Sequence, residues 1–200
     1  MKKILSLIIL LSALAGSVKG QIYTEITYLQ PDGRFGYVFK PGLMYSLGYR
    51  ISEDPLDQWQ ATIYASYYSL NARQDTFPVV AYSSEYPQVR PGYEVYADHY
   101  GWILGFGYQY RILDANFSPF VATDVTVRSE NYRLDSYYYG ISDGSEDVSQ
   151  GYVGFIPKAG LSYGNDQFLL DLGMGYSWNF TSGASTVFWQ TALGVTYFFD

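Results

Sequence analysis

The feature that most constrains the fold is a two-residue alternation near the C-terminal end, over residues 186–199. One row of alternate side chains is almost wholly apolar and consists of Val187, Trp189, Thr191, Leu193, Val195, Tyr197 and Phe199. The intervening row is small, polar or mixed and consists of Phe188, Gln190, Ala192, Gly194, Thr196 and Phe198. Successive side chains of a β-strand point to opposite faces, so this pattern predicts a strand with one apolar face.

The same alternation recurs along the chain and predicts eight strands in all. Their approximate ranges are 21–29, 43–51, 58–70, 93–112, 119–128, 153–163, 168–179 and 186–199. Turn signals such as Pro31-Asp32-Gly33 and Gly164-Asn165-Asp166 separate them. Their lengths lie near the ~9–11 residues that a tilted strand needs to cross a bilayer. The predicted fold class is all-β: an eight-stranded antiparallel up-and-down transmembrane β-barrel.

The first twenty residues have the character of a secretory signal peptide. Lys2 and Lys3 precede an apolar stretch over residues 4–15, which is too short to span a bilayer as a helix. Val18-Lys19-Gly20 is an acceptable cleavage site, with an uncleaved anchor as the alternative. We expect residues 1–20 to be removed and residues 21–200 to form one barrel domain. The chain has no cysteine, which excludes disulfides and thiolate metal sites.

Charge and composition narrow the class further. The net charge of −7 becomes −10 on cleavage because three lysines leave and no acid does. Such acidity argues against nucleic acid as a partner, since phosphates require a basic face. Aromatic residues make up 20% of the chain and tyrosine alone supplies 23 residues, a composition that favours membrane–water boundaries. No apolar run after residue 20 is long enough for a transmembrane helix, so a membrane-spanning chain must close into a barrel.

The connections between the predicted strands alternate in length. Longer ones follow the first, third and fifth strands, with long loops predicted at residues 71–92 and 129–150. Short ones follow the second, fourth and sixth strands. In a barrel whose termini both lie in the periplasm, short turns face the periplasm and long loops face outward. The phase of the pattern therefore predicts periplasmic termini.

If the apolar row faces lipid, the other row fills the lumen. The charged and polar residues that we expect there are Glu25, Arg50, Gln109, Arg111, Asp124, Arg128, Lys158 and Asp171. Charges of both signs inside a low-dielectric cylinder must pair, and glycines on the same row leave room for long side chains. Eight strands leave no open channel. We interpret the charges as structural neutralisation, with a proton or ion relay as the alternative.

A soluble barrel of the lipocalin type would reverse the two faces. Its apolar residues would point inward, but the apolar row contains more large side chains than eight strands can enclose, including Trp59, Trp102, Phe106, Trp178 and Trp189. The opposite row carries glycines and few charges of the kind found on exposed surfaces. We therefore favour the membrane barrel and keep a soluble secreted carrier as an alternative.

The whole mature chain resembles the small eight-stranded outer-membrane barrels of the OmpA-transmembrane and OmpX type, including the short barrel proteins of Bacteroidota. The pattern Gly194-x-x-Tyr197-x-Phe199 is similar to the terminal signal of such barrels. Ala192 stands where that signal usually has a polar residue, and Asp200 follows the aromatic residue that normally closes it. The resemblance implies a Gram-negative outer membrane and folding by the barrel assembly machinery.

Catalytic and metal-binding motifs are weak. His99 is the single histidine; we predict a polar rim position for it, because a deacylase-like His-x-Ser pair is missing and one histidine is a poor metal site. The segment Asp143-Gly144-Ser145-Glu146-Asp147 lacks the spacing of a calcium-binding EF-hand loop. We predict a non-enzyme without metal or cofactor, and an outer-membrane lipid-modifying enzyme is the alternative.

The predicted loops are the best candidates for a function. They contain tyrosines among serines and glycines, a composition that suits adaptable binding surfaces, namely Tyr82, Tyr86, Tyr132, Tyr137, Tyr138 and Tyr139. We therefore expect an integral outer-membrane barrel with a structural or binding role, acting through its surface loops or as a subunit of an envelope assembly. Outer-membrane lipid and an envelope protein are the expected partners.

Overall fold

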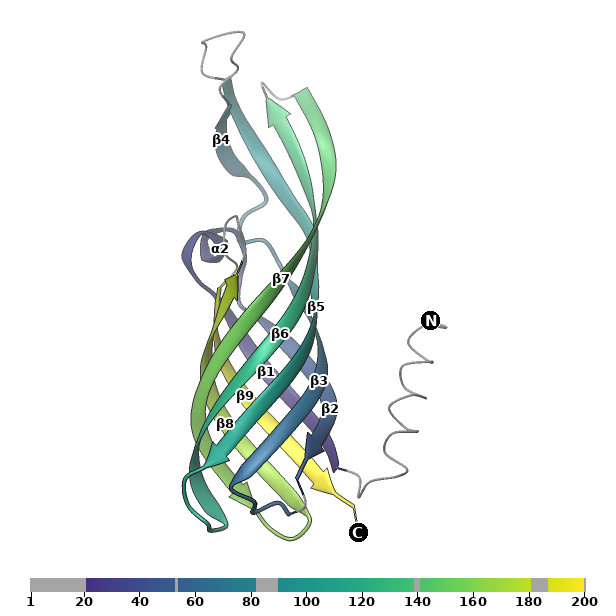
Figure 1. Cartoon of the computed structure of the whole chain (residues 1–200). Helices are drawn as coiled ribbons and strands as arrows, with labels where there is room; N and C mark the ends of the chain where they lie inside the picture. The colour runs from purple at the N-terminus through teal and green to yellow at the C-terminus, as the bar shows by residue number, and fades with distance from the viewer. Residues whose placement is uncertain (1–20, 53, 82–89, 139–140, 181–186, 200) are drawn as a thin grey trace, which may run out of the picture.

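The structure is a computed structural model that describes residues 21–52, 54–81, 90–138, 141–180 and 187–199. Figure 1 shows a tall barrel with a long extension rising from one side of its upper mouth. The elements are β1 (Gln21–Pro31), α2 (Gly33–Val38), β2 (Gly42–Ile51), β3 (Trp59–Leu70), β4 (Phe77–Ala81), β5 (Arg90–Arg111), β6 (Phe117–Tyr138), β7 (Ile141–Gly164), β8 (Phe168–Phe180) and β9 (Phe188–Phe198). The predicted signal peptide, residues 1–20, lies outside the described residues.

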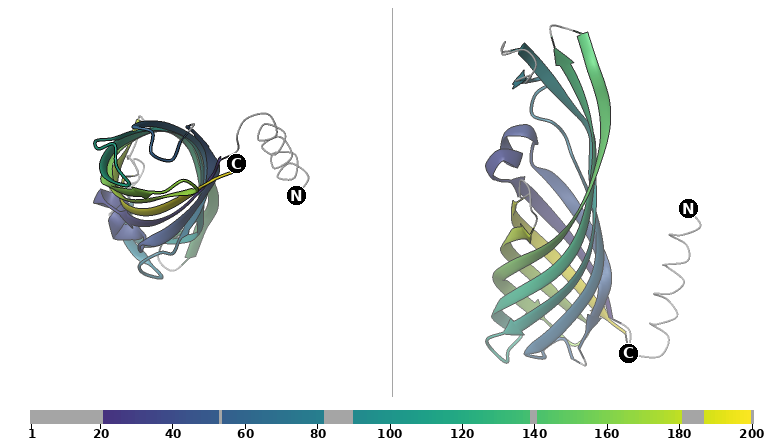
Figure 2. Two further views of the ribbon diagram at one scale, coloured as in Figure 1. Left: turned by 90° about the horizontal axis from the view of Figure 1, so that it is seen from below. Right: turned by 45° about the horizontal axis from the view of Figure 1, so that its top comes forward.

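Eight antiparallel strands form a closed wall, as the alternation predicts. The strands follow the order β3-β2-β1-β9-β8-β7-β6-β5, and an additional pairing of β3 with β5 closes the ring. Figure 2 shows this ring from below. The ninth strand, β4, pairs only with the upper part of β5 and takes no part in the wall. Gln21 pairs with Phe198, so the first and last strands bring their outer ends to the same, lower, end of the barrel.

The two rows of side chains face as predicted. Trp189, Leu193 and Tyr197 of β9 are 51%, 53% and 46% exposed, whereas their neighbours Phe188, Gln190 and Thr196 are buried. Leu104 of β5 and Met174 of β8 are both 61% exposed on the same outer face. Large apolar side chains therefore surround the barrel on the outside, and the interior contains the charges. This arrangement contradicts a lipocalin-like barrel, which would place its apolar row inside.

Above the barrel, β6 and β7 continue through the predicted loop over residues 129–150, and β5 begins three residues before its predicted start. β5, β6 and β7 contain 22, 22 and 24 residues, and their upper parts remain paired almost to the tip. We call these upper parts the ribbon: residues 90–97, 131–138 and 141–149. The prediction of long loops at residues 71–92 and 129–150 was therefore wrong over residues 77–81, 90–92, 129–138 and 141–150, whereas the predicted strand over residues 93–97 is confirmed. The periodicity failed there because both faces of the ribbon are mostly polar, so no apolar row marks the strands.

A short helix partly covers the upper mouth. The sequence suggested a loop or strand extension between β1 and β2, and α2 stands there instead. The Asp32 side chain accepts a hydrogen bond from the Gly33 amide and thereby caps the helix, and Gly33 has a φ of 58°, which glycine adopts without strain. Phe35 from this helix packs on Phe188 with a ring separation of 5.5 Å. Among the described residues, no helix is long and apolar enough to cross a membrane.

Candidate functional site

The seven charged residues predicted for the lumen all lie inside the barrel. Six of them are less than a tenth exposed, namely Glu25, Arg50, Arg111, Asp124, Arg128 and Asp171, and the Lys158 side chain is 12% exposed. An eighth charged residue, Glu130, joins them with 1% exposure. Glu130 falls inside the loop predicted over residues 129–150 and was therefore not predicted for the lumen, although it lies two residues from Arg128 and a continued strand would place both on one face. Among the described residues these four cations and four anions balance.

In the middle of the lumen, two carboxylate groups lie next to one ammonium group. The Lys158 Nζ lies 2.7 Å from Asp124 Oδ2 and 3.8 Å from Glu25 Oε2. Tyr64 donates a hydrogen bond of 2.6 Å to Asp124, and Tyr23 donates one to Glu25. The strands that carry these residues meet only when the wall closes, because Glu25 comes from β1, Tyr64 from β3, Asp124 from β6 and Lys158 from β7. Each carboxylate thus has both a cation and a hydroxyl donor.

Glycines make room for this cluster. A Cβ added at Gly107 would lie 2.7 Å from Asp124 Oδ1, and one added at Gly105 would lie 2.2 Å from Tyr64 Cζ. A side chain at Gly107 would therefore displace Asp124 itself, and one at Gly105 would displace the Tyr64 ring that donates a hydrogen bond to it. Glycines were predicted on the lumen-facing row, and at these two positions they leave the space that Tyr64 and Asp124 occupy.

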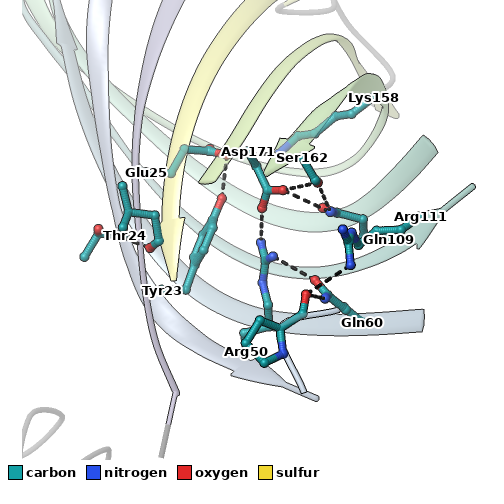
Figure 3. Close-up of polar contacts among 12 residues, drawn as sticks. Tyr23, Thr24, Glu25, Arg50, Gln60, Gln109, Arg111, Lys158, Ser162 and Asp171 are labelled. Carbon is teal, nitrogen blue, oxygen red and sulfur yellow. Dashed lines mark hydrogen bonds and ion pairs between the residues drawn. The ribbon is translucent and has the colours of Figure 1, made fainter. Parts of the chain in front are cut away.

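A second cluster fills the lower lumen (Figure 3). Arg50 Nη2 lies 2.7 Å from Asp171 Oδ2, and Arg50 Nη1 donates a 2.8 Å hydrogen bond to Gln60 Oε1. The other oxygen of Asp171 accepts hydrogen bonds from Gln109, at 3.2 Å, and from Ser162. Asp171 therefore has partners on both oxygens, which a buried carboxylate requires.

Arg111 lies below this cluster, at the lower end of the barrel. Its guanidinium donates to the carbonyl oxygens of Pro55, at 3.2 Å, and Ala115, at 2.6 Å. These carbonyls belong to the short connections after β2 and β5. Arg111 thus ties two turns together beneath the lumen rather than pairing with a carboxylate directly.

The upper lumen combines an ion pair with aromatic rings. Arg128 Nη1 lies 3.4 Å from Glu130 Oε1, and Tyr68 donates a 2.6 Å hydrogen bond to the same oxygen. The Arg128 guanidinium carbon lies 4.8 Å from the centre of the Phe188 ring, within the range of a cation–π contact. Charge is therefore held in place at three levels along the barrel axis.

Little space remains between these clusters. A cavity of about 40 Å³ lies in the middle of the lumen, and its lining includes Tyr23, Glu25, Lys158 and Asp171. This volume accommodates one or a few water molecules and is far smaller than the ~300–1,000 Å³ of a small-molecule site. The described interior is suited to holding charges in fixed pairs and not to holding a ligand.

His99 lies under the helix and not at a polar rim, so that prediction was wrong. Its side chain is 2% exposed, and its ring centre lies 4.4 Å from that of Phe39 and 5.2 Å from that of Phe35. Neither ring nitrogen has a hydrogen-bond partner among the described residues. The position escaped prediction because α2 itself was not expected. A histidine enclosed by rings, without an orienting carboxylate, lacks the geometry of a general base.

The described residues contain no group of three or more His, Asp or Glu side chains that could hold a metal ion. Asp143, Glu146 and Asp147 are exposed residues of β7, spread along an extended strand. An extended strand does not wrap its side chains around a cation, as a calcium loop does. The structure therefore offers no local geometry for calcium at this segment.

The candidate binding tyrosines do not form one patch. Tyr137 stacks on Tyr93 with a ring separation of 4.8 Å, whereas Tyr132 contacts Tyr96 and His99 at 6.0 Å, next to the covered mouth. Burial raises the pKa of Tyr132. Tyr138 pairs with Gly92 near the tip of the ribbon. Tyr82, Tyr86 and Tyr139 lie outside the described residues.

Within the part of the chain that the structure describes, one edge of the ribbon has no strand beside it. β8 pairs with β7 from Val153 to Gly164. Residues 141, 142 and 144–149 of β7 pair with β6 alone among the described residues, and a register shift leaves Asp143 without a partner in β6. Eight of these nine residues are exposed, and Val148 is half-buried. Figure 1 shows this part of β7 rising well above the end of β8. A long row of backbone amide and carbonyl groups therefore faces solvent.

Comparisons with known proteins identify the fold of the chain but not a protein family. No family model matches the chain, and no curated protein matches it. Among solved structures, it is similar to the surface protein NspA of Neisseria, with a TM-score of 0.54 and 16% identity over 91% of this chain and 98% of that one. The N-terminal barrel domain of Pseudomonas aeruginosa OprF (TM-score 0.46, 13% identity, 89% and 98% covered) and Ail of Yersinia pestis (0.41, 14%, 90% and 99%) also match. The chain therefore has the fold of the small eight-stranded outer-membrane β-barrels.

Proposed function

We propose that this chain is an integral outer-membrane β-barrel with a sealed lumen and a structural or binding role carried by its ribbon. The observation that carries this proposal is the closed wall with apolar side chains outside and paired charges inside. Such a wall is stable in lipid, because every backbone group of a closed barrel is paired within the sheet. In water the same wall would expose a continuous apolar belt, which soluble proteins avoid.

Aromatic clusters near both ends of the wall support the membrane placement. At the lower end, Trp59 lies 4.2 Å from Tyr110 between ring centres. Toward the upper end, Tyr176 lies 4.8 Å from Trp189. Aromatic side chains of this kind gather where the hydrocarbon core meets the lipid headgroups. The apolar residues between the two clusters then form the lipid-facing belt.

The direction of insertion follows from the unequal ends. The lower end carries the ends of β1 and β9 and the short connections after β2, β5 and β7, whereas the upper end carries α2 and the ribbon. Barrels of this class place short turns in the periplasm and long segments outside. The termini are then periplasmic and the ribbon is extracellular. Labelling of a Ser145→Cys variant with a membrane-impermeant maleimide on intact cells tests this, and labelling only after lysis would contradict it.

The filled lumen supports a barrel that does not conduct. All the charged lumen side chains except Arg111, which binds turn carbonyls, are in ion pairs, and the cavity between them has a volume of about 40 Å³. Purified protein in planar bilayers should therefore show no stepwise conductance at neutral pH. Regular conductance steps that disappear in a Lys158→Met variant would favour the alternative of an ion relay through the same charges.

The lipid-facing belt and the ribbon each suggest a class of partner. Outer-membrane lipid contacts the belt, the barrel assembly machinery inserts the chain, and an envelope or external protein meets the ribbon. Nucleic acid is disfavoured by the net charge of −7.

A lipid-modifying enzyme of the same architecture is the competing function. The enclosed, unpartnered position of His99 speaks against it, because a deacylase needs a histidine that reaches a nucleophile. Mass spectra of lipid A with and without the protein decide this point. An acyl pattern that changes with the wild-type chain would favour the enzyme.

Fractionation and gel mobility test the central proposal. The protein should remain in carbonate-washed outer membranes, and it should run faster on a gel before heating than after, because a folded barrel resists unfolding by the detergent. A carbonate-soluble protein without a heat-dependent shift would overturn the membrane placement.

A further inference from the structure

His99 lies where the barrel meets the segment that covers its upper mouth. We call this segment the cap: residues 33–40, which comprise α2 and the two residues after it. On the outer face, Trp102 of β5 contacts Tyr67 of β3 with a ring separation of 4.8 Å, and His99 lies three residues above Trp102 along β5. Because aromatic pairs of this kind mark the membrane boundary, His99 lies above the lipid-facing part of the wall.

The cap closes over His99 with aromatic rings. Phe39 and Phe35 of the cap lie 4.4 Å and 5.2 Å from the imidazole between ring centres. Tyr68 of β3 and Tyr132 of β6 approach it at 5.9 Å and 6.0 Å. His99 is 2% exposed, and neither ring nitrogen has a hydrogen-bond partner among the described residues. A neutral imidazole fits this enclosure, because burial of an unpaired charge costs far more than burial of an uncharged ring.

The enclosure already has a cation on its lumen side. The guanidinium carbon of Arg128 lies 4.8 Å from the centre of the Phe188 ring and 5.7 Å from that of Tyr68. The carboxylate of Glu130 is held by Arg128 and by the Tyr68 hydroxyl. The titratable or charged groups on or beside the enclosure are Glu94 and Tyr96 of β5, Tyr68 of β3, and Arg128, Glu130 and Tyr132 of β6, whereas Phe35, Phe39 and Phe188 carry no charge. A second cation at His99 would therefore lack a carboxylate of its own.

These surroundings make closure of the cap depend on pH. Burial, and secondly the charge of Arg128, lower the pKa of His99 to about 4. In an open cap the imidazole contacts water and titrates near its ordinary pKa of ~6.5. The open state therefore binds the proton more tightly than the closed state does. The contribution of His99 to closure is complete above pH ~6.5 and is lost as the pH falls toward about 4.

From this enclosure we infer that residues 33–40 form an acid-sensitive cap, which stays closed over the neutral imidazole of His99 and opens when that imidazole takes up a proton from solvent. The backbone ties the cap to the segment after β3, because Lys40 donates to Asn71 at 2.8 Å and Arg73 donates to Val38 at 2.7 Å. Residues 71–73 are therefore expected to move with the cap.

Opening of the cap uncovers the upper lumen and does not make a pore. It exposes the pair of Arg128 and Glu130 to solvent, while the two lower charge clusters, around Lys158 and Asp171, stay in place. The inference goes beyond the proposed function, since it concerns the mouth of the barrel and is independent of what the ribbon binds.

Backbone hydrogen exchange of the full mature chain in lipid nanodiscs tests the inference. Rates are measured at pH 7.5 and 5.0 and corrected for the intrinsic effect of pH on exchange. The reporting amides, which are hydrogen-bonded in the closed cap, are Gly36, Phe39, Lys40 and Arg73. With a pKa of about 4 in the closed state and ~6.5 in the open state, the open population should rise roughly 25–30-fold between the two pH values. The lower pH is still above the ordinary carboxyl pKa of ~4.

Three variants separate the imidazole from other causes. His99→Phe keeps a ring and removes the titrating group, so it should lose most of the pH response. Phe39→Ala removes the ring 4.4 Å from the imidazole and should accelerate exchange of the cap already at pH 7.5. The matched control is Phe117→Ala, at a ring 55% exposed near the lower end of β6, and it should leave exchange of the cap unchanged.

Nuclear magnetic resonance gives a second readout that needs no variant. The chain has a single histidine, so the signals of a labelled imidazole report on His99 alone. We expect a titration midpoint below about 6, and a midpoint at or above that value would show that the closed cap does not disfavour the proton. Titration of the wild-type chain decides the point even if His99→Phe does not fold.

Three exchange results would also overturn the inference. The first is a rise of less than about tenfold in the open population of the wild-type cap between the two pH values. The second is a pH response in His99→Phe as large as in the wild-type chain, which would assign the effect to other groups. The third is an equal acceleration at residues 131–138 of the ribbon, which would indicate general loosening. Membrane fractionation and heat-dependent mobility report on the proposed function separately.

Discussion

Replacement of Lys158 by methionine should be the most damaging single change in the lumen. The Lys158 ammonium lies 2.7 Å from Asp124 and 3.8 Å from Glu25, and all three side chains are at least seven-eighths buried. Methionine keeps most of the volume and removes the charge, which leaves two carboxylates beside one small cavity. Breaking a buried ion pair from one side costs ~3–5 kcal/mol, and the hydroxyl donors Tyr23 and Tyr64 offset only part of this.

The same reasoning predicts rescue. If the loss comes from uncompensated charge, then adding Glu25→Gln and Asp124→Asn to Lys158→Met should restore stability to within ~1–2 kcal/mol of wild type, because the triple variant has no buried charge left at this level. Lys40→Met, at an exposed lysine, is the matched control and should change stability by less than ~0.5 kcal/mol.

Unfolding in urea, with the protein in lipid vesicles, measures these differences. Tryptophan fluorescence follows the transition, and the heat-dependent gel shift reports independently on the folded fraction. A loss below about 1 kcal/mol in Lys158→Met would show that the ammonium is not what holds the two carboxylates. A triple variant no more stable than the single one would show that packing, and not charge, is at fault.

Three further changes test other parts of the structure. Leu104→Arg, at a side chain 61% exposed on the outer face, should cost ~2–4 kcal/mol in the same urea assay if it lies at mid-bilayer, and a harmless result would contradict the face assignment. Gly105→Ala should cost roughly 1–3 kcal/mol because its Cβ would lie 2.2 Å from Tyr64 Cζ, whereas Gly151→Ala, with its nearest neighbour at 3.9 Å, should change stability by less than ~0.5 kcal/mol; equal effects would refute the packing argument. Burial and the hydrogen bond to Glu94 raise the pKa of Tyr96, so its contribution to ribbon stability is complete below the ordinary tyrosine pKa and is lost as the pH rises above ~10. Hydrogen exchange at residues 90–97 should accelerate there in wild type and much less in Tyr96→Phe, and identical profiles would contradict this role.

The orientation of the wall could be predicted because it depends on local sequence alone. The alternation of Trp189 with Gln190, or of Leu104 with Gly105, fixes which side chains share a face whatever strand lies next to them. One face must then meet lipid and the other the lumen. The structure confirms these faces for all eight strands of the wall.

The contacts inside the lumen could not be predicted in the same way. Arg50 and Asp171 are 121 residues apart, and they meet only because the ring closes with a particular register. Sequence gives the charges but not their heights along the barrel axis. The sequence predicts that charges of both signs must pair. It does not predict which groups meet, for example that Arg111 binds turn carbonyls or that Lys158 bridges two acids.

The upper part escaped prediction for a different reason. Residues 131–138 and 141–149 have polar side chains on both faces, so their strand character rests on backbone pairing that no side-chain pattern reveals. The position of His99 depended in turn on α2, a helix of six residues that lacks the length for a recognisable periodicity. Capping by Asp32 was the one local signal that could have indicated it.

The pairing of β6 with β7 far above the barrel also fixes the height of their tip above the barrel rim. A flexible loop of the same length would change its height continually and often lie close to the lipid surface. A paired strand pair is stiff, and residues 131–138 alone carry the tip ~25 Å beyond the rim. In the proposed orientation, with the ribbon outside the cell, anything that approaches the membrane therefore encounters the tip of the ribbon first, at a constant height above the lipid surface.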